Sequence, residues 1–271
     1  MITSRNNPTI KQIRSLRQRK EREASGLYFV EGIRLVAEAV PSGAPVEQVI
    51  VAPDLLHSPF AHDLVQQQRR AGVPCLEVAA NVFETLSIKE GPQGLAAVLR
   101  QRWESLDHVR LGNELCWIAL DAVADPGNLG TILRTADAVG AGGVILIGNS
   151  TDPYDPAALR GSMGAIFVQR LVRATWDELI RWKRRHRYLL IGTSDKATVD
   201  YQAYRYPTPL VLLMGSERQG LSPEQQAACD AVVSIPMAGR SDSLNLAVAT
   251  GVVLYEIFNQ QRAGREERGA G

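Results

Sequence analysis

The chain contains 271 residues, of which 45% are hydrophobic and 22% are charged, and its formal net charge is +1. This balance is ordinary for a globular protein and excludes a globally basic nucleic-acid binder. No apolar run reaches the roughly 18 residues that cross a membrane. No signal-peptide core follows Met1 either, so neither a membrane partner nor secretion is expected.

The first part of the chain alternates between helical and strand patterns. A helix is predicted over residues 8–24, because Ile10, Ile13 and Leu16 follow helical spacing and Pro8 suits a first turn. Strands are predicted at 27–32, 46–53, 73–78 and 95–100, and further helices at 33–40, 62–72 and 81–87. This alternation predicts an α/β domain over 1–100, followed by a polar linker at 101–113.

The second part repeats the alternation. Strands are predicted at 115–123, 143–148, 166–174, 188–195, 209–217 and 231–237. Helices are predicted at 131–142, 157–162, 177–186 and 243–261. We therefore expect a second α/β domain over 114–262 and a disordered tail at 263–271.

Basic residues gather in two places, at 5–22 and in the run RWKRRHR at 181–187. Solvated helix faces are the ordinary explanation, but such clusters also suit a phosphate backbone. A mitochondrial transit peptide is a third explanation for the first cluster, and the acids Glu21 and Glu23 argue against it.

The three cysteines, Cys75, Cys116 and Cys229, are isolated and form no CxxC pair or metal-ligand cluster. This usage favours a reducing compartment, so we expect a cytoplasmic protein without a metal site. None of the four histidines lies in a motif, and no role is assigned to them.

Three segments combine an apolar run with a loop rich in Gly, Asn and Ser: residues 125–146, 212–222 and 234–251. Such loops gather at the carboxyl ends of strands in an open α/β sheet and form ligand pockets there. A dinucleotide site is not indicated, because G-x-G-x-x-G is absent and the glycines of VGAGGVIL precede a strand. A Walker A loop is absent as well, which disfavours a P-loop nucleotide site. Because the dinucleotide fingerprint is missing, a nicotinamide-dependent oxidoreductase is the least supported function.

The three segments resemble the signature motifs of the SpoU/TrmH family of RNA 2′-O-ribose methyltransferases, in the SPOUT superfamily. The first is similar to PxNxGxxxRxxxxxG, the second to GxExxGL and the third to IPMxxxxxSLNxxxA. The matching positions are Pro126, Asn128, Gly130, Arg134, Gly140, Gly215, Glu217, Gly220, Leu221, Ile235, Pro236, Met237, Ser243, Leu244, Asn245 and Ala249. The first part also resembles the family's ribosomal-protein-like substrate-binding domain, through residues 2–39 and the stretch IKEGPQGLAAV.

This resemblance implies an α/β fold in which the C-terminal domain is a parallel sheet with a deep trefoil knot. A smaller N-terminal α/β domain would bind RNA. The family is typically homodimeric through the C-terminal domain, with the site near the subunit interface. Because chains rarely thread through their own loops, periodicity alone does not suggest a knot.

The resemblance also implies that S-adenosylmethionine is the cofactor, held largely by backbone groups. Gly215 would let the backbone approach the ligand, and apolar neighbours suit an adenine ring. Without the resemblance, these positions are ordinary core and turn residues. The expected cofactor-binding residues are Thr193, Leu213, Met214, Gly215, Ile235, Met237 and Leu244.

Catalysis is expected to involve Arg134, Asn128, Ser243, Asn245 and Glu217, by the same resemblance. The family proposal makes Arg134 the base that removes the 2′-hydroxyl proton. Deprotonating a guanidinium at pH 7 costs roughly 7 kcal/mol, whereas clamping a phosphate needs no deprotonation. We therefore prefer a clamp that also stabilises developing charge. The structural alternatives are a surface salt bridge for Arg134, a helix N-cap for Ser243 and a surface carboxylate for Glu217.

The leading hypothesis is 2′-O-methylation of a ribose in ribosomal RNA, with no metal involved. The alternatives are a transfer-RNA ribose methyltransferase and a catalytically silent RNA-binding protein of the same fold. Arg14, Arg17, Arg19 and Arg134 are expected to bind RNA phosphates. A target in a loop or bulge would give access to the ribose.

Overall fold

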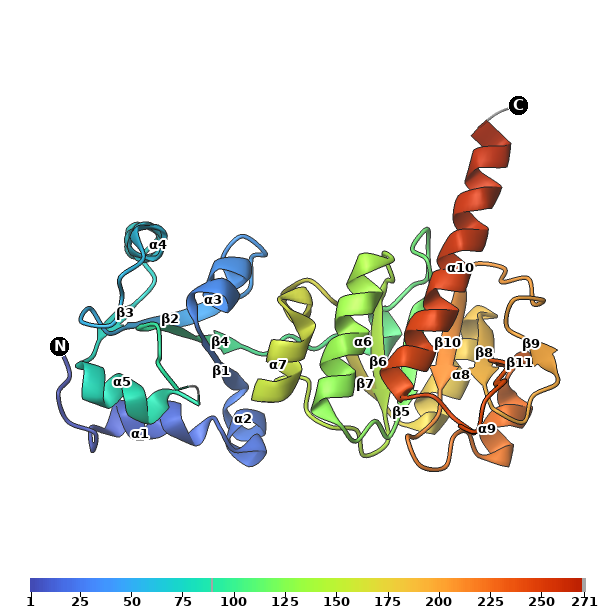
Figure 1. Ribbon diagram of the computed structural model, residues 1–271, viewed down its shortest axis with the longest axis horizontal. Coiled ribbons are helices and arrows are strands. Elements are labelled where there is room, and N and C mark those ends of the chain that lie inside the picture. Colours follow the sequence, from blue (N-terminus) through green and yellow to red (C-terminus); the bar gives the residue numbers. More distant parts are fainter. Residues whose placement is uncertain (89, 270–271) are drawn as a thin grey trace. The chain divides into compact units, whose positions relative to one another are not determined.

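The computed structural model describes residues 1–88 and 90–269 (Figure 1). The chain forms two compact units with mixed helices and strands. The N-terminal unit consists of Met1–Gln101 and Tyr154–Val168, and the C-terminal unit consists of Arg102–Pro153 and Gln169–Gly271. The α/β class expected from the sequence is confirmed.

The N-terminal unit has a four-stranded sheet in the order β1-β4-β2-β3. Its strands are β1 (Leu27–Glu31), β2 (Val46–Val51), β3 (Cys75–Glu77) and β4 (Leu95–Arg100). Strand β4 is antiparallel to β1 and β2, and β3 is parallel to β2. Its first helices are α1 (Pro8–Ser15), α2 (Arg19–Ser25), α3 (Ile33–Ala39), α4 (Pro59–Arg70) and α5 (Ala80–Leu86).

The single helix predicted at 8–24 is wrong, because the chain breaks it between α1 and α2. The break leaves the carbonyl oxygens of Leu16 and Arg17 outside regular helical bonding, and Arg22 donates to both, at 2.9 and 2.8 Å. Arg22 is only 1% exposed, and its guanidinium lies 3.6 Å from the carboxylate of Asp155. A buried charge with these partners favours the break over a continuous helix.

Residues 154–168 pack into the N-terminal unit, although the sequence around them belongs to the C-terminal unit. The ring of Tyr154 lies 4.5 Å from that of Tyr28, and Asp155 begins α7 (Pro156–Ser162) as its N-cap. The strand predicted at 166–174 is therefore shorter than expected. Residues 165–167 form a 3-10 turn, η2, and only Leu171–Ala174 form β7.

The C-terminal unit has a seven-stranded sheet in the order β7-β6-β5-β10-β8-β11-β9. All its strand pairs are parallel. Besides β7, the strands are β5 (Trp117–Asp121), β6 (Gly143–Ile147), β8 (Leu189–Thr193), β9 (Val199–Asp200), β10 (Leu210–Met214) and β11 (Ala231–Ser234).

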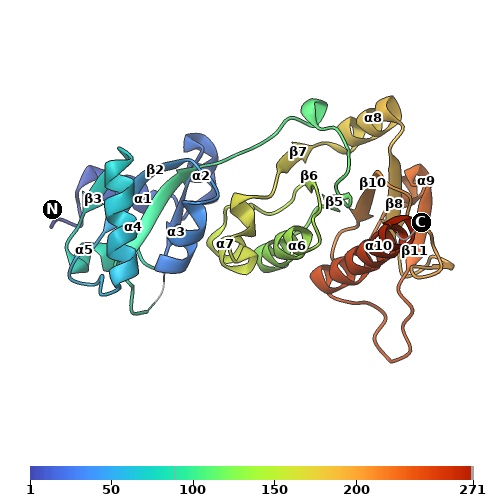
Figure 2. The same cartoon turned by 90° about the horizontal axis from the view of Figure 1, so that it is seen from above.

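Helices cover both faces of this sheet, which buries the central strands (Figure 2). Helices α6 (Pro126–Ala138) and α10 (Leu246–Gly269) lie together on one face, and α8 (Trp176–His186) covers the other (Figure 2). The short helix α9 (Pro223–Ala228) contacts β8.

The segment 101–113, predicted as a linker, contains the 3-10 helix η1 (Leu106–His108), and Leu106 and Val109 belong to the buried core of the C-terminal unit. The predicted tail 263–271 overlaps the end of α10, and residues 270–271 lie outside the described part of the chain.

Candidate active site

Helix α6 begins at Pro126, several residues before the start predicted at 131. Asp125 is its N-cap and accepts a hydrogen bond from the backbone N–H of Asn128 at 2.7 Å, while Pro126 occupies the first helical position. The loop predicted around Asn128 is thus the first turn of the helix. This turn aims the Asn128 side chain at the two loops that follow β10 and β11.

A chain of hydrogen bonds joins the three glycine-rich segments. Asn245 Nδ2 donates to Asn128 Oδ1 at 2.9 Å, and Asn128 Nδ2 donates to Glu217 Oε1 at 2.6 Å. The same Glu217 oxygen accepts from the backbone N–H of Asp125 at 3.4 Å. Residues 89 and 117 positions apart in sequence therefore meet at one point, as their motifs predicted.

Asn245, and not Ser243, caps the start of α10. Its Oδ1 accepts from the backbone N–H groups of Ala247 at 2.9 Å and Val248 at 3.3 Å. Ser243 instead donates to Asp242 Oδ1 at 3.4 Å. The N-cap alternative for Ser243 is wrong, because α10 begins at Leu246, too far along the chain for Ser243 to reach its first free N–H groups.

A pocket of about 380 Å³ lies at the carboxyl ends of β8, β10 and β11. It brings together six of the seven residues predicted to bind the cofactor, and Leu213, the seventh, is fully buried in β10. Glu217 and Ser243 also line it, whereas Asn128, Asn245 and Arg134 do not. The six lining residues are Thr193, Met214, Gly215, Ile235, Met237 and Leu244.

Gly215 marks a close approach of two backbone segments beside this pocket. A Cβ atom built on Gly215 would lie 2.2 Å from the carbonyl carbon of Gly220 and 2.4 Å from the nitrogen of Leu221. No side chain fits at this distance, so the turn after β10 requires glycine. The turn closes with backbone hydrogen bonds between Ser216 and Gly220 in both directions.

Arg134 is exposed on α6, in its third turn, whereas the helix predicted to start at 131 would place it in the first turn. The earlier start of the helix accounts for the difference. Among the described residues, no hydrogen bond or ion pair engages its guanidinium, so the alternative of a salt bridge to Asp121 or Asp137 is not seen. Its neighbour Thr135 packs against Gly251 of α10.

Comparison with known proteins now decides the family. The sequence profile of the SpoU rRNA Methylase family matches residues 116–255, and that of the MRM3-like substrate binding domain matches residues 7–97. The chain belongs to the SpoU rRNA methylase family. The match includes the parallel sheet, the pocket and all three joined segments.

Relatives of this SpoU family member are similar over almost the whole chain. A 23S rRNA (uridine(2479)-2′-O)-methyltransferase from Streptomyces viridochromogenes is 33% identical over 97% of this chain and 93% of its own length. A 23S rRNA (guanosine(2553)-2′-O)-methyltransferase, RlmP, from Bacillus subtilis is 28% identical, covering 94% and 98%. The AdoMet-bound rRNA methyltransferase from Sinorhizobium meliloti is 38% identical, with a TM-score of 0.86 and coverage of 94% and 96%.

The SpoU pocket also contains polar residues that sequence reasoning missed. Three segments supply them: the segment after β8, the turn after β10 and the loop after β11. Their signal was positional, because residues just beyond the carboxyl end of a parallel strand face the ligand crevice. The missed lining residues include Ser194, Asp195, Lys196, Ser216, Arg218, Gln219 and Asp242.

The three N-terminal arginines predicted to bind RNA all have partners within the N-terminal unit. Arg14 donates to the Arg5 carbonyl at 2.7 Å, and Arg19 pairs with Glu23 at 2.9 Å. Arg17 donates to the Thr85 and Ser87 carbonyls at 3.0 and 2.7 Å, where it caps the end of α5.

No thiolate is available to the SpoU site at neutral pH from the two C-terminal cysteines. Burial raises the pKa of Cys229 to about 11 and that of Cys116 to about 12.

Within residues 1–88 and 90–269, no group of three or more His, Cys, Asp and Glu side chains is placed to share a metal ion. None of the helices in the same ranges combines the length and apolar character needed to cross a bilayer.

Proposed function

We propose that this protein transfers a methyl group from S-adenosylmethionine to the 2′-hydroxyl of a ribose in ribosomal RNA. The observation that carries the proposal is the Asn245–Asn128–Glu217 chain, which joins all three family motifs at the mouth of a pocket. The named activities of the relatives from Streptomyces and Bacillus support it.

The pocket residues fit S-adenosylmethionine in size and chemistry. A volume of about 380 Å³ lies in the range of small-molecule sites, and Met214, Ile235 and Leu244 provide apolar walls for an adenine ring. Gly215 and its turn present backbone groups with no side chain between them and the ligand. The polar side of the pocket, around Asp195 and Lys196, suits ribose hydroxyls and a carboxylate.

S-adenosylmethionine, when bound, supplies a methyl group on a positively charged sulfur. The 2′-oxygen must be aligned with that methyl carbon and must lose its proton as the new O–C bond forms. Asn128, Glu217 and Asn245 act here as positioning residues, because they bond to one another and fix the turn, the α6 start and the α10 start. Ser243 lines the pocket and offers a hydroxyl to orient the ribose.

Arg134 is proposed to hold the phosphate next to the target ribose and to stabilise negative charge on the 2′-oxygen. Its exposure on α6 leaves the guanidinium able to make a bidentate contact with phosphate. The proton then passes to water, which reaches this exposed edge. Base catalysis by Arg134 is disfavoured by the cost of deprotonating a guanidinium.

Assembly and location complete the proposal. Val248 and Tyr255, seven positions apart on one side of α10, are 52% and 48% exposed, which supports a homodimer through this helix. A trefoil knot and a cytoplasmic location are proposed with it, the knot from family membership and the location from ribosomal RNA as substrate. A Val248→Asp/Tyr255→Asp variant that stays dimeric in light scattering after size-exclusion chromatography would contradict the α10 interface.

The activity is tested by incubating the protein with labelled S-adenosylmethionine and with ribosomal or transfer RNA separately. Ribose-methylation mapping in cells with and without the protein then identifies the nucleotide. Label in ribosomal RNA alone is the expected result. Label in transfer RNA alone would assign the alternative substrate. Binding of S-adenosylmethionine without transfer to either RNA would indicate a catalytically silent RNA-binding protein.

A further inference from the structure

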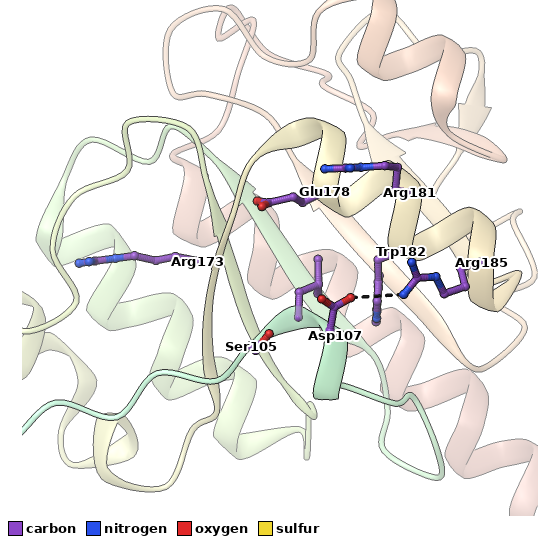
Figure 3. A pocket seen from close by; sticks show the side chains of 8 residues that line it. Ser105, Asp107, Arg173, Glu178, Arg181, Trp182 and Arg185 are labelled. Carbon is purple, nitrogen blue, oxygen red and sulfur yellow. Dashed lines mark hydrogen bonds and ion pairs between the residues drawn. The ribbon is translucent and has the colours of Figure 1, made fainter.

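A second pocket, of about 250 Å³, lies in the C-terminal unit between η1, the end of β7 and α8 (Figure 3). It shares no lining residue with the S-adenosylmethionine pocket. Arg181 and Arg185 come from successive turns of α8, and Arg173 comes from β7. The complete lining is Ser105, Leu106, Asp107, Arg173, Glu178, Arg181, Trp182 and Arg185.

Weak local contacts hold these arginines in place. The Arg173 guanidinium lies 3.9 Å from the centre of the Trp103 ring, in a cation–π contact. Arg181 Nε donates to the Asp177 carbonyl at 3.3 Å. Arg185 pairs with Asp107 at 3.4 Å, and their side chains are 68% and 75% exposed. An ion pair this exposed contributes little stability, so a stronger anion can replace Asp107.

The acidic residues of the pocket do not cancel its positive charge. Glu178 accepts hydrogen bonds from the Thr175 backbone N–H at 2.7 Å and the Thr175 hydroxyl at 2.9 Å, which complete the cap of α8. Those bonds lower the pKa of Glu178 and hold its carboxylate at the start of the helix. The positive charge of Arg181 also lowers the pKa of Glu178, and Asp107 pairs with Arg185, so two carboxylates face three arginines in this lining.

Arginines continue along α8 beyond this pocket. Arg181 also lines an adjoining open groove of about 620 Å³ together with Arg184 and Trp176, and the groove contains the carboxylates of Asp177 and Glu224 as well. Trp182, which lines the first pocket, is fixed by burial and by a hydrogen bond: its side chain is 3% exposed, and its Nε1 donates to the Val109 carbonyl at 3.3 Å. Arginines therefore follow a path along the helix over a rigid surface.

Helix stabilisation alone does not explain this arrangement. Basic residues in a last turn offset the helix dipole, which accounts for Lys183, Arg184 and Arg185. It does not account for Arg173, which lies on a strand, or for Arg181, which precedes that turn. The Arg173 side chain extends away from Arg181 and Arg185 (Figure 3), so each guanidinium would bind a separate phosphate with its paired N–H groups.

We infer that this pocket and the adjoining groove bind successive phosphates of the substrate RNA backbone, an inference that rests on the proposed function. Phosphate contacts set affinity and register, while contacts to bases choose the sequence. The arginines of α8 would thus hold RNA without selecting the nucleotide.

The test compares wild-type protein with an Arg173→Gln/Arg181→Gln/Arg185→Gln variant in binding a fluorescent, single-stranded RNA of mixed sequence. Arg205→Gln is the matched control, because Arg205 is exposed in the same unit and lines neither pocket. Losing three phosphate contacts should lower the magnitude of the slope of log K against log salt concentration by about 2. The ratio of the wild-type affinity to the affinity of the triple variant should therefore fall roughly 20-fold between about 50 and about 200 mM salt. The control should keep the wild-type slope.

The affinity for S-adenosylmethionine, measured by calorimetry, should not change in any of these variants. If the triple variant has a reduced salt slope but the wild-type protein transfers no methyl group to RNA, the inference stands and the proposed function is overturned. A wild-type slope in the triple variant would overturn the inference, including when binding of poly-glutamate is lost, which would assign the pocket to an acidic protein. If the triple variant unfolds, the Arg181→Gln/Arg185→Gln variant keeps the Arg173–Trp103 contact and should lower the slope by about 1.4.

Discussion

Replacing Gly215 by alanine tests the close approach of two backbone segments beside the pocket at the ends of β8, β10 and β11. The new methyl group would lie 2.2 Å from the Gly220 carbonyl carbon, where ordinary contacts begin near 3.4 Å. The turn 216–220 must therefore move by about 1 Å, because both contacting groups are backbone and neither can rotate away. The movement displaces residues that line the pocket on that side, including Glu217.

The expected cost follows from this geometry. Overpacking in a rigid region lowers the free energy of unfolding by about 1–3 kcal/mol, and a clash with backbone belongs at the upper end. For a unit of this size, about 3 kcal/mol corresponds to a fall in Tm of roughly 6–12 °C. Because the turn also forms one wall of the pocket, we expect the affinity for S-adenosylmethionine to fall at least about tenfold, or about 1.4 kcal/mol.

Two matched glycines separate steric clash from backbone strain. Gly220→Ala meets no atom within 4 Å but has φ +65°, so it should cost only about 1–2 kcal/mol of strain. Gly239→Ala meets nothing and has no unusual φ, so its effect should stay within about 0.5 kcal/mol. Thermal melts and calorimetric titrations of all three variants provide the comparison. If Gly215→Ala matches Gly239→Ala in both, the close approach has no energetic consequence and the reasoning fails.

Three further predictions concern the site and its surroundings. Arg134→Lys should lower kcat/KM for RNA about tenfold or more, because lysine keeps the charge but loses the bidentate contact; near-full activity in a steady-state assay would refute the clamp. Asn128→Asp places a second carboxylate against Glu217, 2.6 Å away in the native pair, so methyl transfer should fall about tenfold at pH 8 and recover partly as the pH falls and one carboxylate is protonated; full activity at pH 8 would contradict the positioning role. Burial raises the pKa of Cys229 to about 11 and that of Cys116 to about 12, so both thiols stay protonated below those values. Both should resist iodoacetamide in the native protein at pH 8, and Cys229 should become reactive only as the pH approaches 11. Rapid labelling at pH 8, detected by mass spectrometry, would exclude this.

Six of the residues expected to bind the cofactor line one pocket because they lie at or beyond strand ends. Motif spacing and the position of loops after β8, β10 and β11 were enough to bring Thr193, Gly215 and Ile235 together. The sequence could not show how Asn128 and Glu217 use their side chains, since a hydrogen bond between residues 89 positions apart depends on tertiary structure. The early start of α6 was also missed, because the glycines of PGNLG favour a loop by local propensity, whereas Asp125 and Pro126 stabilise a helix start.

Tertiary contacts also explain the errors in the N-terminal unit. The apolar spacing at 8–24 fits one helix, but a buried Arg22 needs the carbonyls that only a break supplies. In the same way, the apolar run at 166–174 supplies a turn to one unit and a strand to the other. Local periodicity carries no information about which core an apolar residue enters.

The return of residues 154–168 to the N-terminal unit makes the two units inseparable as contiguous pieces of sequence. The chain passes between them three times, at 101/102, 153/154 and 168/169. A fragment ending at Gln101 would lack Asp155, and the buried Arg22 would lose its carboxylate partner. Exchange of substrate-binding domains between relatives by a single recombination event would therefore leave an unpaired charge in the core, and a successful exchange must carry both segments together.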